Sequence, residues 1–277
     1  MSEALGAEAV GLAQAAAVAA PPEVGQRNRP WLRFRRHRLA MFGTAAILVL
    51  VLATIIGPWL IPFDELHIDI RNRFAPPLTG GHLFGTGPLG RDLAARLLTA
   101  GRLSLAVGFS AMLISASFGT LIGVVAGYYG GLVGTALMRF VDAILCFPTI
   151  FLLLVLAAFI VPNVAMITLI IAATAWMEVA RIVASQIGTL RERDFTLAAE
   201  MLGASGSYIM FNELLRNAVG PIIVAATLTV ARAILLEAYI SFLGYGIQPP
   251  MASWGNMLNN AQQYLCLLYT SPSPRDR

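Results

Sequence analysis

The sequence predicts an all-α integral membrane protein that crosses the bilayer several times. Of its 277 residues, 57% are hydrophobic and only 12% are charged, whereas a soluble domain carries about 25% charged residues. The mean hydropathy is +0.73. Several apolar runs are also long enough to cross a hydrocarbon core of about 30 Å at about 1.5 Å per residue. These observations exclude a soluble enzyme, a secreted disulfide scaffold and a disordered chain.

Residues 1–38 are predicted to form a cytoplasmic tail. Residues 1–26 are rich in alanine and contain no arginine, and a basic cluster follows them: Arg27, Arg29, Arg33, Arg35, Arg36 and Arg38. A signal peptide would place its basic residues before an apolar core, which is the opposite order. Under the positive-inside rule, the cluster marks the cytoplasmic side of the first span.

The first membrane helix is predicted at residues 39–63, which carry no charge. Pro58, Trp59 and Pro62 mark its far end, where an aromatic ring sits well at the membrane interface. Residues 64–101 are polar and rich in glycine, and we expect them to form a periplasmic loop.

Four more membrane helices are predicted between residues 102 and 265. Glycines at 127–134 and the Pro162-Asn163 pair interrupt the apolar sequence there. The predicted helices are 103–126, 137–161, 164–182 and 218–243. The segment after the last of them, 244–265, is expected to lie outside the membrane on the periplasmic side.

Residues 266–277 (CLLYTSPSPRDR) have neither helical periodicity nor spanning length. We interpret them as a non-native tail, such as adapter or vector read-through, and exclude them from the fold. Five helices would then be present, and a sixth would have been lost by truncation.

The polar segment at residues 185–217 is predicted to contain a short helix, a glycine break at Gly203 and a second short helix capped by Ser205. Ala198 and Ala199 leave a thin helix face that another backbone can approach closely. A short helix between two spans could pass motion into the membrane. The alternative is an ordinary solvated loop.

This segment resembles the EAA loop of ABC importer permeases, which couples the membrane subunit to its ATPase. Leu197 stands where that pattern usually has Glu, and Arg216 replaces the usual Pro. The positions that match or fit the pattern are Ala198, Ala199, Gly203, Ile209 and Leu215. The resemblance implies that residues 185–217 form the coupling loop.

Four other stretches resemble one branch of these importers, the second permease subunit of dipeptide, oligopeptide and nickel transporters. They are Leu83–Asp92, Met138–Pro148, Glu237–Gly244 and Gln248–Leu258. Together the matches cover about residues 30–264. The resemblance implies a type I ABC importer transmembrane domain in the cytoplasmic (inner) membrane of a prokaryote, with a permease core at residues 102–265. It implies inward passage of di- or oligopeptides, with nickel complexes as the alternative substrate.

The resemblance also implies the partners: a second permease subunit, cytoplasmic ATP-binding subunits and an extracytoplasmic substrate-binding protein. The chain has no lysine and no G-x-x-x-x-G-K-[ST] phosphate loop, so ATP is expected to be hydrolysed by the separate subunits. We expect no cofactor, no nucleic-acid partner, no catalytic residue and no metal site, since the three histidines lie far apart in sequence.

Charged residues inside membrane spans are costly and are therefore candidates for function. Arg139 with Asp142, and Glu178 with Arg181, have i,i+3 spacing near predicted cytoplasmic ends, and we expect each pair to associate or to meet headgroups.

Arg232 lies deeper in its helix. Our hypothesis is that Arg232 lines the translocation path and attracts a peptide carboxylate. The alternative is an ion pair with an acidic group on a neighbouring helix or subunit.

Pro148 is predicted to lie within a helix, where it would permit a kink and could serve as a hinge, although such prolines are often only structural.

Three other functional classes compete with an ATP-driven permease. An ion-coupled secondary transporter normally needs protonatable or Na⁺-binding groups near the midplane, and the acidic residues here are predicted mostly near helix ends. A non-transporting fragment is a second alternative, because of the tail. A membrane enzyme is disfavoured, since no His, Cys or carboxylate constellation has catalytic spacing.

Overall fold

The computed structural model describes residues 34–159 and 163–269, and these residues are helical apart from turns, loops and two isolated β-bridges. The chain divides into two units between Leu52 and Ala53, within the first described helix. The helices are α3 (Arg38–Leu60), the 3₁₀ turn η2 (Ile70–Asn72), α4 (Leu93–Tyr129), α5 (Gly131–Leu145), α6 (Thr149–Phe159), α7 (Val164–Arg191), α8 (Asp194–Met201), α9 (Gly206–Tyr208), the π-helix η3 (Ile209–Leu214), α10 (Leu215–Phe242) and α11 (Trp254–Tyr269).

Four of these helical stretches are long and apolar enough to cross a membrane: α3, α4, α7 and the continuous stretch Gly206–Phe242. A fifth is present if α5 and α6, which are bent by 79° at their junction, are counted as one span. The predicted continuous helix at 137–161 is therefore wrong. Pro148 lies in the break, where it cannot donate a backbone hydrogen bond, and its carbonyl accepts from Phe151 N at 3.0 Å to begin α6.

Several helices extend beyond the predicted limits, because hydropathy does not register polar helical turns. The predicted loop 64–101 ends at Asp92, whose carboxylate caps α4 by accepting from Ala95 N at 2.6 Å. Helix α7 continues to Arg191 rather than 182, which places Glu178 near its middle instead of at its end.

Helix α11 begins within residues 244–265, the segment expected on the periplasmic side, and it continues into the predicted tail as far as Tyr269. Residues 270–277 lie outside the described residues, as do residues 1–33 of the predicted cytoplasmic tail.

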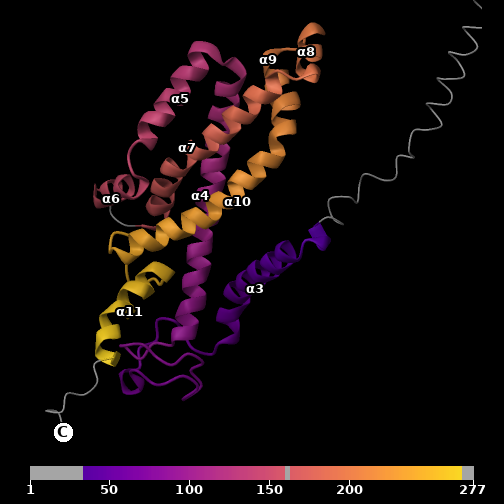
Figure 1. Ribbon diagram of the computed structural model, residues 1–277. Helices are drawn as coiled ribbons and strands as arrows, with labels where there is room; N and C mark the ends of the chain where they lie inside the picture. Colours follow the sequence, from indigo (N-terminus) through magenta and orange to yellow (C-terminus); the bar gives the residue numbers. More distant parts are fainter. Residues whose placement is uncertain (1–33, 160–162, 270–277) are drawn as a thin grey trace, which may run out of the picture. The chain divides into compact units, whose positions relative to one another are not determined.

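The second unit is built on α4 and α7, which pack in parallel along most of their length (Figure 1). Gly119, Gly123 and Gly127 recur every fourth residue on the face of α4 that meets α7. A Cβ atom at Gly123 would lie 2.6 Å from the Val183 Cβ and 2.7 Å from the Ala180 carbonyl oxygen. Only glycine permits this approach, which is typical of small-residue contacts between membrane helices.

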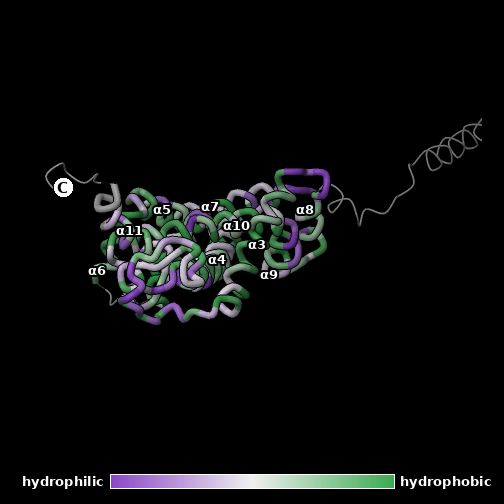
Figure 2. Tube along the Cα trace, turned by 90° about the horizontal axis from the view of Figure 1, so that it is seen from below, coloured by the Kyte–Doolittle hydropathy of each residue, from purple (hydrophilic) through white to green (hydrophobic). Residues whose placement is uncertain are grey.

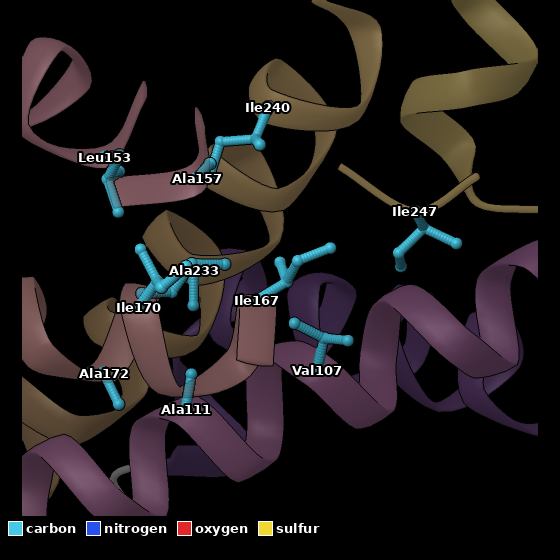
Figure 3. Packing of buried hydrophobic residues seen from close by; sticks show 11 residues of the cluster. Val107, Ala111, Leu153, Ala157, Ile167, Ile170, Ala172, Ala233, Ile240 and Ile247 are labelled. Atoms are coloured by element: carbon cyan, nitrogen blue, oxygen red, sulfur yellow. The ribbon is translucent and has the colours of Figure 1, made fainter. Parts of the chain in front are cut away.

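Helix α10 runs antiparallel to α4 and closes the bundle, so the bundle has two ends (Figure 1). We call them the α8 end, where α4 and α7 finish and α10 begins, and the α11 end, where α4 begins and α10 finishes. The main hydrophobic core lies between them and is formed by α4, α6, α7 and α10 (Figure 3). Its side chains include Val107, Leu153, Ile171, Ala233 and Ile240. Hydrophobic residues predominate along the helices in Figure 2, and a hydrophilic stretch lies beside α8.

The loop before α4 is fixed by its own polar residues. The Thr86 hydroxyl accepts from Ala75 N at 2.8 Å and donates to the Asn72 carbonyl. His82 Nδ1 lies 2.8 Å from Asp92 Oδ2, and both side chains are buried. These contacts hold the loop against the start of α4, because the Asp92 carboxylate both caps that helix and binds His82.

We expect Gly123→Ala to destabilise the protein by about 1–3 kcal/mol, because the added methyl group overpacks a backbone contact. The change is measured as the melting temperature of the purified protein in detergent. Gly188→Ala on α7 is the control, since its Cβ would meet nothing within 4 Å. Equal melting temperatures for the two variants would contradict the close contact between α4 and α7.

Candidate functional site

The predicted coupling loop is an ordered helical segment at the α8 end. Helix α7 ends at Arg191, and α8 follows after a short turn. The Thr196 hydroxyl of α8 is buried and donates to the Leu190 carbonyl at 2.9 Å, which fixes α8 to the end of α7. Arg191 in turn donates to the Tyr129 carbonyl at 3.4 Å and so joins the ends of α7 and α4.

The glycine break after α8 is a Schellman motif. Ala204 N donates to the Ala199 carbonyl at 3.1 Å, and Gly203 N donates to the Glu200 carbonyl at 3.0 Å. This geometry needs a left-handed residue after the helix, and Gly203 has a φ of +79°. Ser205 then caps α9 by accepting from Tyr208 N at 3.4 Å. A short helix, a glycine break and a second capped helix are therefore present as the sequence predicted.

A π-helix joins this segment to α10. Residues 209–214 form it, and Ile209, Met210 and Leu214 are buried. They pack in a second hydrophobic cluster with side chains of α4 and α7: Val124, Val179, Val183 and Ile187. The predicted coupling loop, residues 185–217 and called the coupling segment below, is thus attached to the bundle by apolar packing. The π-helix continues into α10 without an intervening loop.

The six sequence-predicted coupling residues separate into two groups. Leu197, Ala198 and Gly203 are exposed. The other three face the second cluster: Ile209 is buried, and Ala199 and Leu215 are half-buried against it.

Two residues that sequence reasoning did not single out have the most exposed large hydrophobic side chains of this segment. Met201 and Leu202 are 90% and 88% exposed, next to Gly203. Together with Leu197, which is 47% exposed, they form an apolar tip (Leu197, Met201 and Leu202). The signal that could have found them is the helical spacing of Leu197 and Met201, at i and i+4.

Two ion pairs within the spans join different helices rather than neighbours along one helix. Arg181 of α7 pairs with Asp142 of α5, and Arg232 of α10 pairs with Glu178 of α7. The expected pairs of sequence neighbours, Arg139 with Asp142 and Glu178 with Arg181, are wrong. The reason is geometric, because α7 presents Glu178 and Arg181 to partners on two other helices, α10 and α5.

The position of Arg232 matches the alternative raised from the sequence, an ion pair with a neighbouring helix. Yet the pair is far from enclosed, since the side chains of Arg232 and Glu178 are 57% and 49% exposed. Half-exposed charges near the middle of a membrane helix do not face lipid, so this pair meets water or protein.

A small polar pocket of about 150 Å³ lies in the loop before α4 and is lined in part by Asp64, His67 and Asp69. Its carboxylates already serve the loop: Asp64 accepts from Leu66 N at 3.1 Å. The Asn72 side chain donates to Asp69 and thereby lowers the pKa of that carboxyl group. No group of three metal-ligating side chains that could hold an ion occurs among the residues described.

Comparison with known families decides the class. Residues 119–272 match the model of the binding-protein-dependent transport system inner membrane component. The chain belongs to this family. Residues 26–77 also match the N-terminal transmembrane domain of oligopeptide transport permease C. The chain is therefore a multi-pass inner-membrane permease of a bacterial ABC importer, and it is the permease component rather than the ATPase.

Curated relatives cover most of this permease. It is 38% identical over 242 residues to a putative peptide permease of Brucella suis biovar 1, a match that covers 87% of the chain and 80% of the relative. It is 36% identical to the dipeptide transport system permease DppC of Bacillus subtilis, over 86% of the chain and 74% of the relative. It is 35% identical to the oligopeptide transport system permease OppC of Haemophilus influenzae, over 82% and 74%. The resemblance inferred from the sequence motifs is confirmed.

We expect Arg232→Glu to destabilise the permease, because it places a second carboxylate beside Glu178. The double variant Arg232→Glu with Glu178→Arg should restore stability, with an interaction energy of about 0.5–3 kcal/mol in a double-mutant cycle. The measurement is the melting temperature of the purified permease. Arg139→Glu is the control, since Arg139 forms no ion pair within the described part of the chain. Additive effects of the two exchanges would refute the pairing.

Proposed function

We propose that this permease passes di- or oligopeptides inward as one half of a type I importer transmembrane domain. The observation that carries the proposal is the agreement between relatives and architecture. The relatives compared above are named as peptide, dipeptide and oligopeptide permeases, each about 35–38% identical over more than four fifths of the chain. An ordered helix, α8, lies at one end of the bundle within the segment predicted to couple to the ATPase, and this supports the proposal.

The apolar tip on α8 supports a cytoplasmic ATP-binding subunit as the partner at that end. Exposed Met201 and Leu202 would be costly in water without a partner. The buried Thr196 and the second hydrophobic cluster hold α8 against the bundle. A displacement of α8 by the ATPase would therefore reach α10 directly. A second permease subunit and an extracytoplasmic substrate-binding protein complete the proposed assembly.

The Arg232–Glu178 pair supports a place on the translocation path. Its half-exposed charges lie near the middle of α7 and of α10, where a water-filled path or the second permease would cover them. A peptide terminus could exchange with one partner of the pair, its carboxylate meeting Arg232 in place of Glu178.

The coupling role is tested with Gly203→Asp in proteoliposomes that contain the complete transporter. The variant adds a charge beside the apolar tip and strains a left-handed residue by about 1 kcal/mol. We expect ATP hydrolysis to continue while trialanine uptake per ATP falls at least about tenfold. Gly131→Asp, at the start of α5 and outside residues 185–217, is the matched control, since Gly131 also has a positive φ, +47°, and its Cβ would meet nothing within 4 Å. Normal uptake per ATP in Gly203→Asp would refute the assignment.

The path role is tested with Arg232→Gln and two peptides, trialanine and its C-terminal amide. We expect uptake of trialanine to fall at least about fivefold more than uptake of the amide, since only the free acid offers a carboxylate to Arg232. Arg139→Gln serves as the control for loss of one positive charge. An equal effect on both peptides would exclude Arg232 from carboxylate recognition.

A further inference from the structure

One buried carboxylate is not used by the proposed function. Glu237 lies on α10, five residues before its end, and its exposed fraction is 0%. No arginine or histidine pairs with it among the described residues. A carboxylate inside a membrane span is costly without compensation, so its hydrogen bonds indicate what it does.

Both oxygens of Glu237 accept hydrogen bonds from serine hydroxyls. Ser104 of α4 donates to Oε2 at 2.8 Å, and Ser241 of α10 donates to Oε1 at 2.7 Å. Each hydroxyl also accepts from a backbone N–H of the segment that follows α10: Trp254 N at 3.4 Å to Ser104, and Ile247 N at 3.0 Å to Ser241. We call these five residues the Glu237 network.

The direction of these bonds makes the carboxylate the centre of the network. A hydroxyl has one hydrogen to donate, and in both serines that hydrogen goes to Glu237. Each backbone N–H then finds the lone pair that the serine leaves available. Without the carboxylate, two buried hydroxyls would lose their acceptor, and the contacts with Ile247 and Trp254 would lose their orientation.

The network joins four parts of the α11 end: α4, the end of α10, the α10–α11 loop at residues 243–253, and the start of α11 at Trp254. Further bonds hold the loop itself, because the Asn256 side chain donates to the carbonyls of Ile247 at 3.1 Å and Met251 at 2.8 Å. The Trp254 ring nitrogen also donates to the Leu97 carbonyl of α4 at 3.3 Å. The loop tip at residues 248–251 is exposed, although its two flanks are buried.

Helix α10 connects the coupling segment to the Glu237 network, because it begins at the coupling segment and carries Glu237 and Ser241 near its other end. Helix α10 follows the π-helix at the α8 end and reaches Glu237 about 33 Å later, by the rise of about 1.5 Å per residue. We propose that Glu237 is a positioning residue that fixes the α10–α11 loop to α10, so that the loop and the coupling segment move together during transport. This inference rests on the proposed importer function.

The test compares variants in the complete transporter, reconstituted with its own substrate-binding protein loaded with trialanine. The quantity measured is the ratio of ATP hydrolysis with the loaded binding protein to hydrolysis without it. We expect Glu237→Ala to lower this ratio at least about fivefold, which is the size of a typical coupling between two sites. Glu237→Gln should be intermediate, because its amide oxygen still accepts from one serine. Thr229→Val is the matched control, since Thr229 is a buried polar residue of α10 whose hydroxyl, within the described part of the chain, bonds to Ala225 of its own helix alone.

A purely structural role would reduce the amount of assembled transporter and leave the ratio of the surviving complexes unchanged, and that result overturns the inference. If Glu237→Ala does not assemble, Ser104→Ala and Ser241→Ala decide, since each removes one arm of the network. If the ratio of stimulated to unstimulated ATP hydrolysis is unchanged in both serine variants, the inference about Glu237 is overturned, while the proposed importer function still stands. Absence of stimulation by trialanine in the unaltered transporter would overturn the proposed function and this inference with it.

Discussion

The close approach of α4 and α7 is the contact on which the rest of the bundle depends. Glycines at every fourth position of α4 bring the two backbones together, and the side chains of Val183 and Ile187 then fill the space beside them. In lipid, the hydrophobic effect does not drive two helices together, so the attraction comes from van der Waals contacts between closely packed backbones and side chains. The alignment of α4 with α7 also determines where in the bundle the end of α7 lies, and therefore where α8 begins.

This dependence explains how one short segment can be both fixed and exposed. Ile209 and Leu214 are anchored in a cluster whose other walls belong to α4 and α7, whereas Met201 and Leu202 project away from it. The segment has a rigid base and an apolar tip. Such an arrangement passes a displacement of the tip into the bundle instead of absorbing it in a loop.

The sequence predicted the class of fold, the family and the helical character of the coupling segment, because these depend on long apolar runs and on short local patterns. It missed the first turns of α4, where Arg96 interrupts the apolar run, and α11, which is rich in Asn and Gln. It also paired Glu178 with the wrong arginine. The Ser104–Glu237 hydrogen bond joins residues 133 positions apart, and only the packing of α4 against α10 brings them together.

The π-helix at residues 209–214 has a consequence for how the sequence of this region can change. A π-turn accommodates one residue more than an α-helical turn, so it is a place where a single residue can be lost while the hydrogen-bonded helix is kept. Because the π-turn takes up the extra residue, its deletion would return this turn to an α-helix and leave the segments on either side in nearly the same orientation. A deletion in an ordinary α-helical turn would instead rotate one segment relative to the other by about 100°. This turn is therefore the place where the chain between the apolar tip and α10 can change its length by one residue while the permease presents the tip to a partner in the same direction.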